Sequence, residues 1–423
     1  MLSDLQTWLL TVFAAMLTVH GFVNLYLTLY AWADPARIDQ ARAPKTFRPP
    51  LFGFSLLLPS RHEHQVIGET LRRLATINYP VHKFELIVLC TPDDQATINA
   101  ARASIARYRI GNARVVVFDP PSGKARAMNI GLAAARHELV TIFDAEDDVS
   151  PDILNIANTL YHNQAIDILQ GGVQLMNFDS QWFSAANVLE YFFWFKSRMH
   201  YYARSGIVPL GGNTVFFKKR DVLHVGGWDE KCLTEDADIG IRLSLAGKRF
   251  GVMYDAAHVT REETPATVAA FIKQRTRWNQ GFLQITGKGD WRRLSRIKQI
   301  SLVLYILESP SFMAWVLALA PVTLFLGWYV QANILVSLLS FMPLILSVLN
   351  IVVSLVGLYE FGQEQVCRIR WRHYFKFLLA YLPYQLMLAA ASWRALWRHY
   401  RGQHAWEKTA HFGAHRPAGG SSL

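Results

Sequence analysis

The chain carries four carboxylates within five residues, in the run Asp144-Ala145-Glu146-Asp147-Asp148, directly after an apolar segment. Carboxylates this close together repel one another, so the run is unfavourable unless a cation neutralises it. Carboxylate oxygens are suitable ligands for Mg²⁺ or Mn²⁺, which proteins commonly share with the phosphates of a substrate. The run therefore predicts a divalent-cation site, with a solvated acidic turn as the alternative.

A second acidic group follows in Thr234-Glu235-Asp236-Ala237-Asp238. Thr234 is suited to begin a helix and Gly247 to follow its end. The acids would then lie in the first turn, where the helix dipole favours negative charge, and they could be there only to stabilise the helix. Three acids exceed what capping needs, and a carboxylate at the edge of a cleft could act as general base toward a hydroxyl.

Two basic features could bind phosphate. Gln274, Arg277 and Trp278 are spaced so that they share one face of a helix. On that face Arg277 could chelate phosphate oxygens and Trp278 could stack on a sugar ring or a base. The alternative is a basic helix that rests on lipid. Lys124, in Gly123-Lys124-Ala125, could reach a phosphate from the start of a helix, or it could be a solvated surface lysine.

Alternating apolar and helical segments precede and position these motifs. We expect strands at 54–58, 84–90, 114–119 and 138–144, with helices at 64–77, between the second and third strands to about 107, and at 123–136. Such alternation favours an α/β fold with a mostly parallel sheet covered on both faces. Ligands of these sheets bind beyond the carboxyl ends of the strands. The acids that follow Phe143 lie at such a position, and Lys124 lies at another.

Two segments lack charged residues altogether, 5–33 and 309–359. A membrane span needs about 20 apolar residues, so the first segment predicts one span and the second predicts two. The first has no basic start and is too long for a signal peptide, so we expect it to be retained. Basic residues follow it closely, and positive charge beside a span marks the cytoplasmic side. These residues are Arg37, Arg42, Lys45 and Arg48.

We therefore expect four parts: a transmembrane helix at 1–35, an α/β domain at 50–290, interfacial and transmembrane helices at 291–395 and a basic tail at 396–423. The run 377–393 contains Pro383 and Gln385, and the basic residues after it argue that the tail shares the cytoplasmic side with the domain. We expect this run to re-enter or to lie at the interface rather than to cross.

Three further expectations come from composition. The aromatic-rich segment 182–204 predicts an amphipathic helix on the membrane face, with a core helix as the alternative. The end of the tail after Ala414 predicts disorder. The net charge of +11 gathers near the apolar segments, and without a nucleic-acid motif it indicates anionic lipid rather than nucleic acid. Three distant cysteines offer neither a disulfide framework nor zinc spacing.

The motifs in their order resemble the family-2 membrane glycosyltransferases, the group that holds cellulose, hyaluronan and poly-N-acetylglucosamine synthases. The resemblance spans residues 50–290. It is carried by Pro59-x-Arg61-x-Glu63, Gly123-Lys124-Ala125, Asp144-Ala145-Glu146-Asp147, Thr234-Glu235-Asp236 and Gln274-x-x-Arg277-Trp278. It implies a Rossmann-like GT-A domain on the cytoplasmic side, with membrane helices, and an inverting single displacement.

The resemblance also implies roles for individual residues. Asp144 and Glu146 would bind Mg²⁺ or Mn²⁺, and Asp236 would be the catalytic base. Glu63, Asp93, Lys124, Asp144 and Arg277 would bind the donor nucleotide sugar. Gln274, Trp278 and Glu235 would bind the acceptor, near the loop Gly211-Gly212-Asn213-Thr214.

Three departures from the family pattern matter. Glu146 stands where the family has a second Asp, so Asp147 is an alternative ligand. Cys90-Thr91-Pro92-Asp93-Asp94 replaces the usual paired Asp after the second strand. Segment 406–411 resembles the family's C-terminal segment that closes over the nucleotide.

The predicted function is inverting sugar transfer from a nucleotide-diphosphate sugar to a saccharide acceptor, which forms a β-linked polysaccharide or oligosaccharide at the inner membrane. The expected partners are the donor, a saccharide or lipid-linked acceptor and membrane lipids, with no nucleic acid. Transfer of one sugar to a polyprenyl phosphate or other lipid is the alternative. A non-catalytic membrane subunit with a degenerate domain is the alternative of another class.

Overall fold

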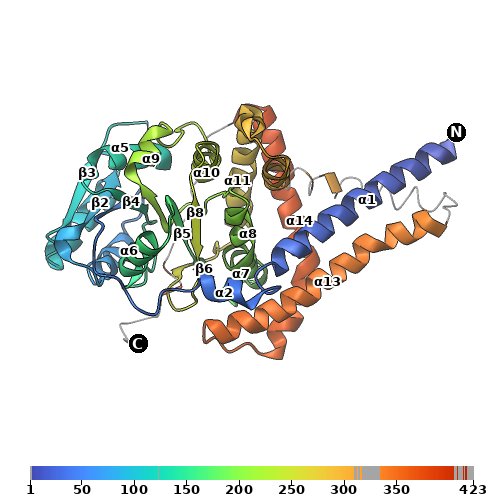
Figure 1. Cartoon of the computed structure of the whole chain (residues 1–423), viewed down its shortest axis with the longest axis horizontal. Coiled ribbons are helices and arrows are strands. Elements are labelled where there is room, and N and C mark those ends of the chain that lie inside the picture. Colours follow the sequence, from blue (N-terminus) through green and yellow to red (C-terminus); the bar gives the residue numbers. More distant parts are fainter. Residues whose placement is uncertain are drawn as a thin grey trace.

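A seven-stranded mixed sheet forms the centre of the protein in this computed structural model (Figure 1). The structure describes residues 2–121, 123–308, 312, 315–316, 334–403, 407, 413 and 415–416. The strand order is β3-β2-β1-β4-β7-β5-β8. The strands are β1 (Phe54–Pro59), β2 (Phe84–Cys90), β3 (Ala113–Val117), β4 (Leu139–Ile142), β5 (Ile168–Gly171), β7 (Val215–Lys218) and β8 (Phe250–Met253).

The first four strands run parallel, as the apolar runs predicted, and lie within a few residues of the expected positions. β7 is antiparallel to both of its neighbours, and β8 is parallel to β5. A small second sheet pairs β6 (Val173–Leu175) with β9 (Thr260–Glu262). The sheet is thus mostly parallel, and the predicted α/β class is confirmed.

Helices cover both faces of the large sheet, which explains why its strands are apolar on both sides. Leu57 of β1 packs in the same core as α5, whereas Leu56 packs in the opposite core with α3, α4 and α6. The domain helices are α3 (Ile67–Leu74), α4 (Gln95–Arg107), α5 (Lys124–Ala134), α6 (Ile153–Asn163), α7 (Ser184–Phe193), α8 (Met199–Arg204), α9 (Lys219–His224), α10 (Glu235–Leu245) and α11 (Val268–Lys288). Short helical turns lie at η1 (Val81–Lys83), η2 (Trp194–Arg198) and η3 (Asp290–Arg293).

Two long apolar helices project from the domain as a pair, α1 (Leu2–Leu29) and α13 (Ile334–Glu364) (Figure 1). Both are long and apolar enough to cross a membrane, over Leu5–Leu29 and Leu338–Glu364. Only 11% and 17% of these windows are buried, so their apolar side chains face outward, as lipid-facing side chains do. The predicted N-terminal helix is therefore present. One of the two spans predicted within 309–359 corresponds to α13, and the remainder lies outside the described residues.

Two sequence predictions about helices need correction. Pro383 does not interrupt the run 377–393 and the run does not re-enter, because α14 (Trp371–Tyr400) is one continuous helix that packs along α11. Within the described residues α14 is not one of the helices long and apolar enough to cross a membrane, and its position at the interface stays a prediction. The segment 182–204 is not an exposed interfacial helix, since residues such as Phe192, Phe195 and Tyr202 are almost completely buried. It forms α7, one π-helical turn at η2, and α8, packed against α1, α13 and α14. The alternative prediction for this segment, a helix buried in the core, agrees with the structure.

A buried lysine joins the domain to the apolar pair. Lys196 of η2 is 4% exposed, and its ammonium lies 2.5 Å from carboxylate oxygens of both Glu360 and Glu364 of α13. Trp32, which follows α1, donates its indole N–H to Glu360 at 2.8 Å. One cation thus holds η2, the end of α1 and the end of α13 together.

We predict that Lys196→Met lowers the free energy of unfolding by about 3 kcal/mol, because it leaves two carboxylates without their buried counter-charge. Thermal unfolding followed by tryptophan fluorescence in detergent measures the loss. The triple variant Lys196→Met/Glu360→Gln/Glu364→Gln should recover most of it, since no charge is then left unpaired. Exposed Lys231→Met is the control and should unfold like the wild type. Equal stability of Lys196→Met and the wild type would contradict the assignment.

Candidate active site

The acidic run after β4 divides into two pairs with different surroundings. Asp144 and Glu146 line a large cavity at the carboxyl ends of the strands. Asp147 is completely buried and turns the other way, where it accepts the Asn213 amide N–H at 3.0 Å and the Asp144 backbone N–H at 2.8 Å. Burial, together with the charges of Glu262, Asp144 and Glu146, raises the pKa of Asp147. The geometry therefore leaves Glu146, rather than Asp147, facing the cavity beside Asp144.

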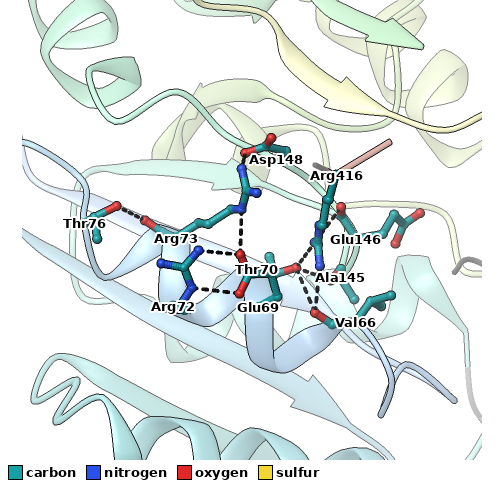
Figure 2. A network of polar contacts seen from close by, with 10 residues as sticks. All are labelled: Val66, Glu69, Thr70, Arg72, Arg73, Thr76, Ala145, Glu146, Asp148 and Arg416. Atoms are coloured by element: carbon teal, nitrogen blue, oxygen red, sulfur yellow. Dashed lines mark hydrogen bonds and ion pairs between the residues drawn. The ribbon is translucent and has the colours of Figure 1, made fainter. Parts of the chain in front are cut away.

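Asp148 serves the fold. Its carboxylate pairs with Arg73 of α3, and its backbone bridges to Arg261 beside β9 through two hydrogen bonds. The ion pair with Arg73 fixes the end of the acidic run to α3 (Figure 2), and the backbone bridge to Arg261 fixes it to the small sheet. The solvated-turn alternative for the run is therefore wrong, since every one of its acids is at least mostly covered.

The backbone of the acidic run is held from two further directions (Figure 2). The Thr70 hydroxyl donates to the Ala145 carbonyl at 2.5 Å. From the C-terminal tail, the Arg416 guanidinium donates to the carbonyls of Glu146 at 2.8 Å and Val66 at 3.2 Å, and to the Thr70 hydroxyl at 2.6 Å. The tail thus returns to the loop that carries Glu146.

This return corrects one expectation about the tail and supports another. Disorder after Ala414 was wrong for His415 and Arg416, because both are packed against the domain. The contacts of His415 and Arg416 with the domain support the expectation that the tail lies on the same side as the domain, which stays a prediction; Glu407 in turn pairs with Arg394 and Arg398 of α14. The rest of segment 406–411 lies outside the described residues.

Lys124 is the cation that balances the open pair of acids. It begins α5, and its ammonium lies 2.6 Å from an Asp144 carboxylate oxygen. Burial disfavours the charged lysine, but the negative charges of Asp144, Glu235 and Asp236 outweigh it and raise the pKa of Lys124. Lys124 is therefore part of the site, and the solvated-surface alternative is wrong.

Glu235 and Asp236 begin α10 and face the same cavity. The Asp236 carboxylate accepts the Ala237 backbone N–H at 2.8 Å, as the first turn of a helix allows. Thr234 precedes the helix as expected, although its side chain makes no capping hydrogen bond, and Gly247 follows the helix in the left-handed conformation. Burial and the charge of Asp236 raise the pKa of Glu235 from 4.5 to about 7, and burial raises the pKa of Asp236.

Two glycines create the room for these acids. A Cβ on Gly212 would lie 2.9 Å from the Asp236 carboxylate, and Gly212 has a φ of +81°, which other residues rarely adopt. A Cβ on Gly281 of α11 would lie 2.2 Å from the Thr234 hydroxyl. The absent side chains let α11 approach the start of α10, which brings Arg277 to the same cavity as Asp236.

Helix α11 presents Gln274, Arg277 and Trp278 to the cavity, on one face as their spacing predicted. Arg275, on the adjacent face, stacks over the Trp278 ring at 4.5 Å and pairs with Glu190 of α7. The indole ring is therefore held in place by a cation that is itself fixed by an ion pair. This supports a platform for a bound ring rather than a tryptophan resting on lipid.

The two remaining candidates behave differently from each other. Glu63, just before α3, lines the cavity and is nearly buried. Asp93 does not line it; its carboxylate is half exposed and lies 3.1 Å from Arg61, which does. Asp94, its neighbour, caps α4 and accepts the His62 backbone N–H, so the acids after β2 organise the loop. Direct binding of the donor by Asp93 stays a prediction. In the structure Asp93 is connected to the cavity through Arg61.

All the other candidates meet in one cavity of about 1060 Å³. At one end it is lined by Lys124, Asp144, Glu146, Asp236 and Arg277. It continues between the apolar helices, where its walls include Asn24 of α1, Asn350 of α13 and Gln385 of α14. A charged catalytic end and a mostly apolar end therefore belong to one continuous space.

The acids of the cavity fit a divalent cation that is shared with a substrate, rather than one held by protein ligands alone. Across the described part of the chain, no three His, Cys, Asp or Glu side chains gather as a complete protein-only metal cage. Asp144 and Glu146 do supply two carboxylates on the cavity wall, and Mg²⁺ is commonly held by one or two carboxylates together with substrate phosphates. The pair suits a cation that arrives with a diphosphate.

The sequence did not indicate the roles of three residues of the site, which are Asn213, Glu262 and Arg275. Asn213, just before β7, bridges Asp147 to Glu262 of β9, and this contact between the two sheets cannot be foreseen from local sequence. Arg275 lies in the recognised motif, but its partner Glu190 is far away in the chain. The only sequence signal was the position of Asn213 in the loop already singled out beside Gly211 and Gly212.

Comparisons with known proteins agree with this geometry. A family model described as Glycosyltransferase like family 2 matches residues 49–281. The chain is 28% identical over 236 residues to a beta-monoglucosyldiacylglycerol synthase of Synechocystis, which covers 54% of this chain and 47% of that protein. It is 24% identical over 266 residues to a poly-beta-1,6-N-acetyl-D-glucosamine synthase of Staphylococcus epidermidis, covering 62% of each. The chain spans less than two thirds of the length of these curated relatives.

Among solved structures, the chain is similar to the mannosyltransferase PcManGT from Pyrobaculum calidifontis in complex with GDP-Man and Mn²⁺. The TM-score is 0.62 at 18% identity, and the match covers 92% of this chain and 99% of that one. At this identity the likeness concerns the fold, and it confirms the GT-A prediction.

The raised pKa of Glu235 predicts a pH-dependent stability. Between pH 4.5 and 7 the folded protein holds a proton on Glu235 that the unfolded chain has released, so stability falls as pH rises through this window. Glu235→Gln removes the buried charge, and we expect it to raise the free energy of unfolding at pH 8 by about 3 kcal/mol, with little change at pH 4.5.

Thermal unfolding at the two pH values measures this difference. Exposed Glu230→Gln is the matched control and should show no pH-dependent gain. A Glu235→Gln protein whose stability differs from the wild type equally at both pH values would contradict a buried carboxyl that titrates near neutrality.

Proposed function

The chain belongs to the glycosyltransferase family 2, and from that membership we propose that it transfers a sugar, with inversion, from a nucleotide-diphosphate sugar to a hydroxyl of a lipid-anchored acceptor. The observation that carries the proposal is the single cavity. It joins the acids at the sheet to the space between α1, α13 and α14. An acceptor with an apolar chain can lie between these helices while its hydroxyl reaches the acids.

The residues of the cavity support a single-displacement reaction. The acceptor oxygen forms a bond to the anomeric carbon as the bond from that carbon to the phosphate oxygen breaks, and the nucleoside diphosphate leaves. Asp236 takes the proton of the acceptor hydroxyl. Arg277 and Lys124 offset the charge that develops on the diphosphate. Attack opposite the leaving group turns an α-linked donor into a β-linked product.

Asp144 and Glu146 are the residues that would hold a divalent cation with the diphosphate. When bound, Mg²⁺ or Mn²⁺ supplies electrostatic stabilisation of the leaving group. Without it, the two carboxylates would repel an incoming diphosphate. The bound cation would bridge these like charges. Glu63 and Asp93, through Arg61, are proposed to complete the donor side, while Gln274, Trp278 and Glu235 complete the acceptor side.

We place the domain on the cytoplasmic side of the inner membrane. Basic residues cluster just after the domain end of α1, at Arg37, Arg42 and Lys45, and positive charge favours that side. Nucleotide sugars are available there to the donor end of the cavity.

Synthesis of a β-linked polysaccharide is the second candidate. Gln274, Arg277 and Trp278 favour it, because the motif resembles that of processive enzymes and the platform formed by Trp278 suits a terminal sugar. Two spanning helices within the described residues give it less support than a lipid acceptor. A degenerate, non-catalytic subunit is disfavoured by the joint presence of Asp144, Glu146 and Asp236 in one cavity.

We predict that purified protein, incubated with a panel of radiolabelled nucleotide sugars, Mn²⁺ and total membrane lipid, produces a labelled lipid. Asp236→Asn should lower turnover by about 10²–10⁴-fold, because the acceptor hydroxyl loses its base. Donor affinity, measured separately by calorimetry, should stay within twofold of the wild type.

The size of the labelled product distinguishes the two candidate functions, and the turnover of Asp236→Asn tests the base. A labelled polymer in place of a labelled lipid would favour the second candidate. Near-normal turnover by a folded Asp236→Asn protein would remove Asp236 as the base.

For the metal, we predict that exhaustive chelation abolishes transfer and that Mn²⁺ restores it. Glu146→Gln should raise the Mn²⁺ concentration required for half-maximal activity by about tenfold or more, since one of two carboxylate ligands is lost. Asp147→Asn is the matched control. It should mainly alter stability and leave the Mn²⁺ requirement near that of the wild type, because Asp147 faces Asn213. The reverse ranking of the two variants would assign the metal to Asp147.

A further inference from the structure

A second cation lies only two residues from Lys196, but its surroundings are different. Arg198 ends η2 and lines the cavity where α7 and α8 meet the base of the α1 and α13 pair (Figure 1). Its guanidinium donates to the Asn24 amide oxygen at 2.6 Å and to the Thr28 hydroxyl at 2.8 Å, both on α1. Asn24 in turn donates to Asn350 of α13 at 2.8 Å.

The partners of Arg198 are all neutral. Among the residues that the structure describes, no carboxylate lies within ion-pair distance of its guanidinium, whereas Lys196 has both Glu360 and Glu364. An uncompensated cation between apolar helices is unfavourable, and such residues commonly mark the path of a ligand or ion. Asn24 and Thr28 orient the guanidinium but leave its positive charge for an anion that enters the cavity.

Arg198 and Asp236 line the same cavity from different elements, η2 and α10. Phe195, also of η2, lies against Gly211, where an added Cβ would be 2.7 Å from the ring. The next residue, Gly212, lies against the Asp236 carboxylate. A molecule that fills the cavity can therefore present an anion to Arg198 and a hydroxyl to Asp236.

The cavity beyond Arg198 is suited to an apolar chain. Its walls there are contributed by α1, α13 and α14, and include Leu17, Leu346, Leu382 and Leu386. The cavity thus brings apolar walls, the Arg198 cation and the Asp236 carboxylate together in one space.

We propose that Arg198 binds the phosphate of a membrane-lipid acceptor whose headgroup also carries the hydroxyl that receives the sugar. This inference rests on the proposed function and names the class of its acceptor. The apolar chains lie between α1, α13 and α14, the phosphate meets Arg198, and the hydroxyl reaches Asp236. A lipid phosphate without a hydroxyl fits the cation but offers nothing for the base to deprotonate.

The binding test needs no sugar donor. Full-length protein in detergent is titrated with phosphatidylglycerol or with diacylglycerol of the same acyl chains, and bound lipid is counted by native mass spectrometry. Arg198→Gln should weaken phosphatidylglycerol binding by about tenfold or more, because one hydrogen-bonded charge is lost, and should leave diacylglycerol binding within twofold. Arg204→Gln, an exposed arginine on α8, is the matched control and should bind both lipids like the wild type. Unchanged phosphatidylglycerol binding by Arg198→Gln, or an equal loss for both lipids, would overturn the proposal.

The transfer test identifies the source of the phosphate and keeps the two proposals apart. Labelled nucleotide sugars are offered with phosphatidylglycerol, with a prenyl-diphosphate sugar and with undecaprenyl phosphate, which has no hydroxyl. Transfer to either of the first two, with a raised lipid KM and a nearly unchanged kcat in Arg198→Gln, supports the proposal and names the lipid. Transfer to undecaprenyl phosphate instead overturns the requirement for a hydroxyl. Absence of transfer to any acceptor contradicts the proposed function, while the binding result still decides the role of Arg198.

Discussion

Crowded negative charge at the carboxyl ends of the strands is the constraint on which the rest of this structure depends. Asp144, Glu146 and Asp147 follow β4, and Glu235 and Asp236 meet them from the start of α10. Burial makes their repulsion stronger than it would be in water. Lys124 lies close to these acids, and their charges raise its pKa. The negative charge of the region therefore favours a bound cation. A site that binds a divalent cation together with a diphosphate is one way for such a region to reach charge balance.

The same constraint separates carboxylates that hold the fold from those that remain open. Asp147 accepts hydrogen bonds from Asn213, and Asp148 is paired with Arg73, so neither can turn to the cavity without losing a buried partner. With these two fixed, the part of the loop that precedes them places Asp144 and Glu146 at the cavity. Arg416 and Thr70 hold the loop through its carbonyl groups and leave its carboxylates alone. These contacts position the loop that carries the acids through its backbone.

The sequence predicted the parts of the fold that depend on local patterns. Apolar runs placed the first four strands, and the spacing of Gln274, Arg277 and Trp278 placed one helical face. Errors arose where tertiary packing overrode a local rule. Pro383 is accommodated within α14, which packs along α11, and the aromatic segment that contains Phe192 is buried because other helices cover it. Which acid faces the cavity depended on Asn213, a partner far away in sequence, so no local pattern could decide it.

Charge also connects the domain to the membrane helices. Over the turn η2, Lys196 points to two glutamates of α13 and Arg198 points to amide and hydroxyl groups of α1. A π-helical turn changes the angular spacing of its side chains, which lets neighbouring cations reach different helices. Lys196, which is paired with two glutamates, fixes η2 to α13. Arg198, which has no carboxylate partner among the described residues, lines the cavity. Because η2 continues from α7, whose Glu190 pairs with Arg275 over the Trp278 ring of α11, the turn at the membrane helices and the helix that carries Trp278 are joined by one ion pair. The helix α7 thus contacts both the part of the cavity that Trp278 lines and the turn that carries Arg198.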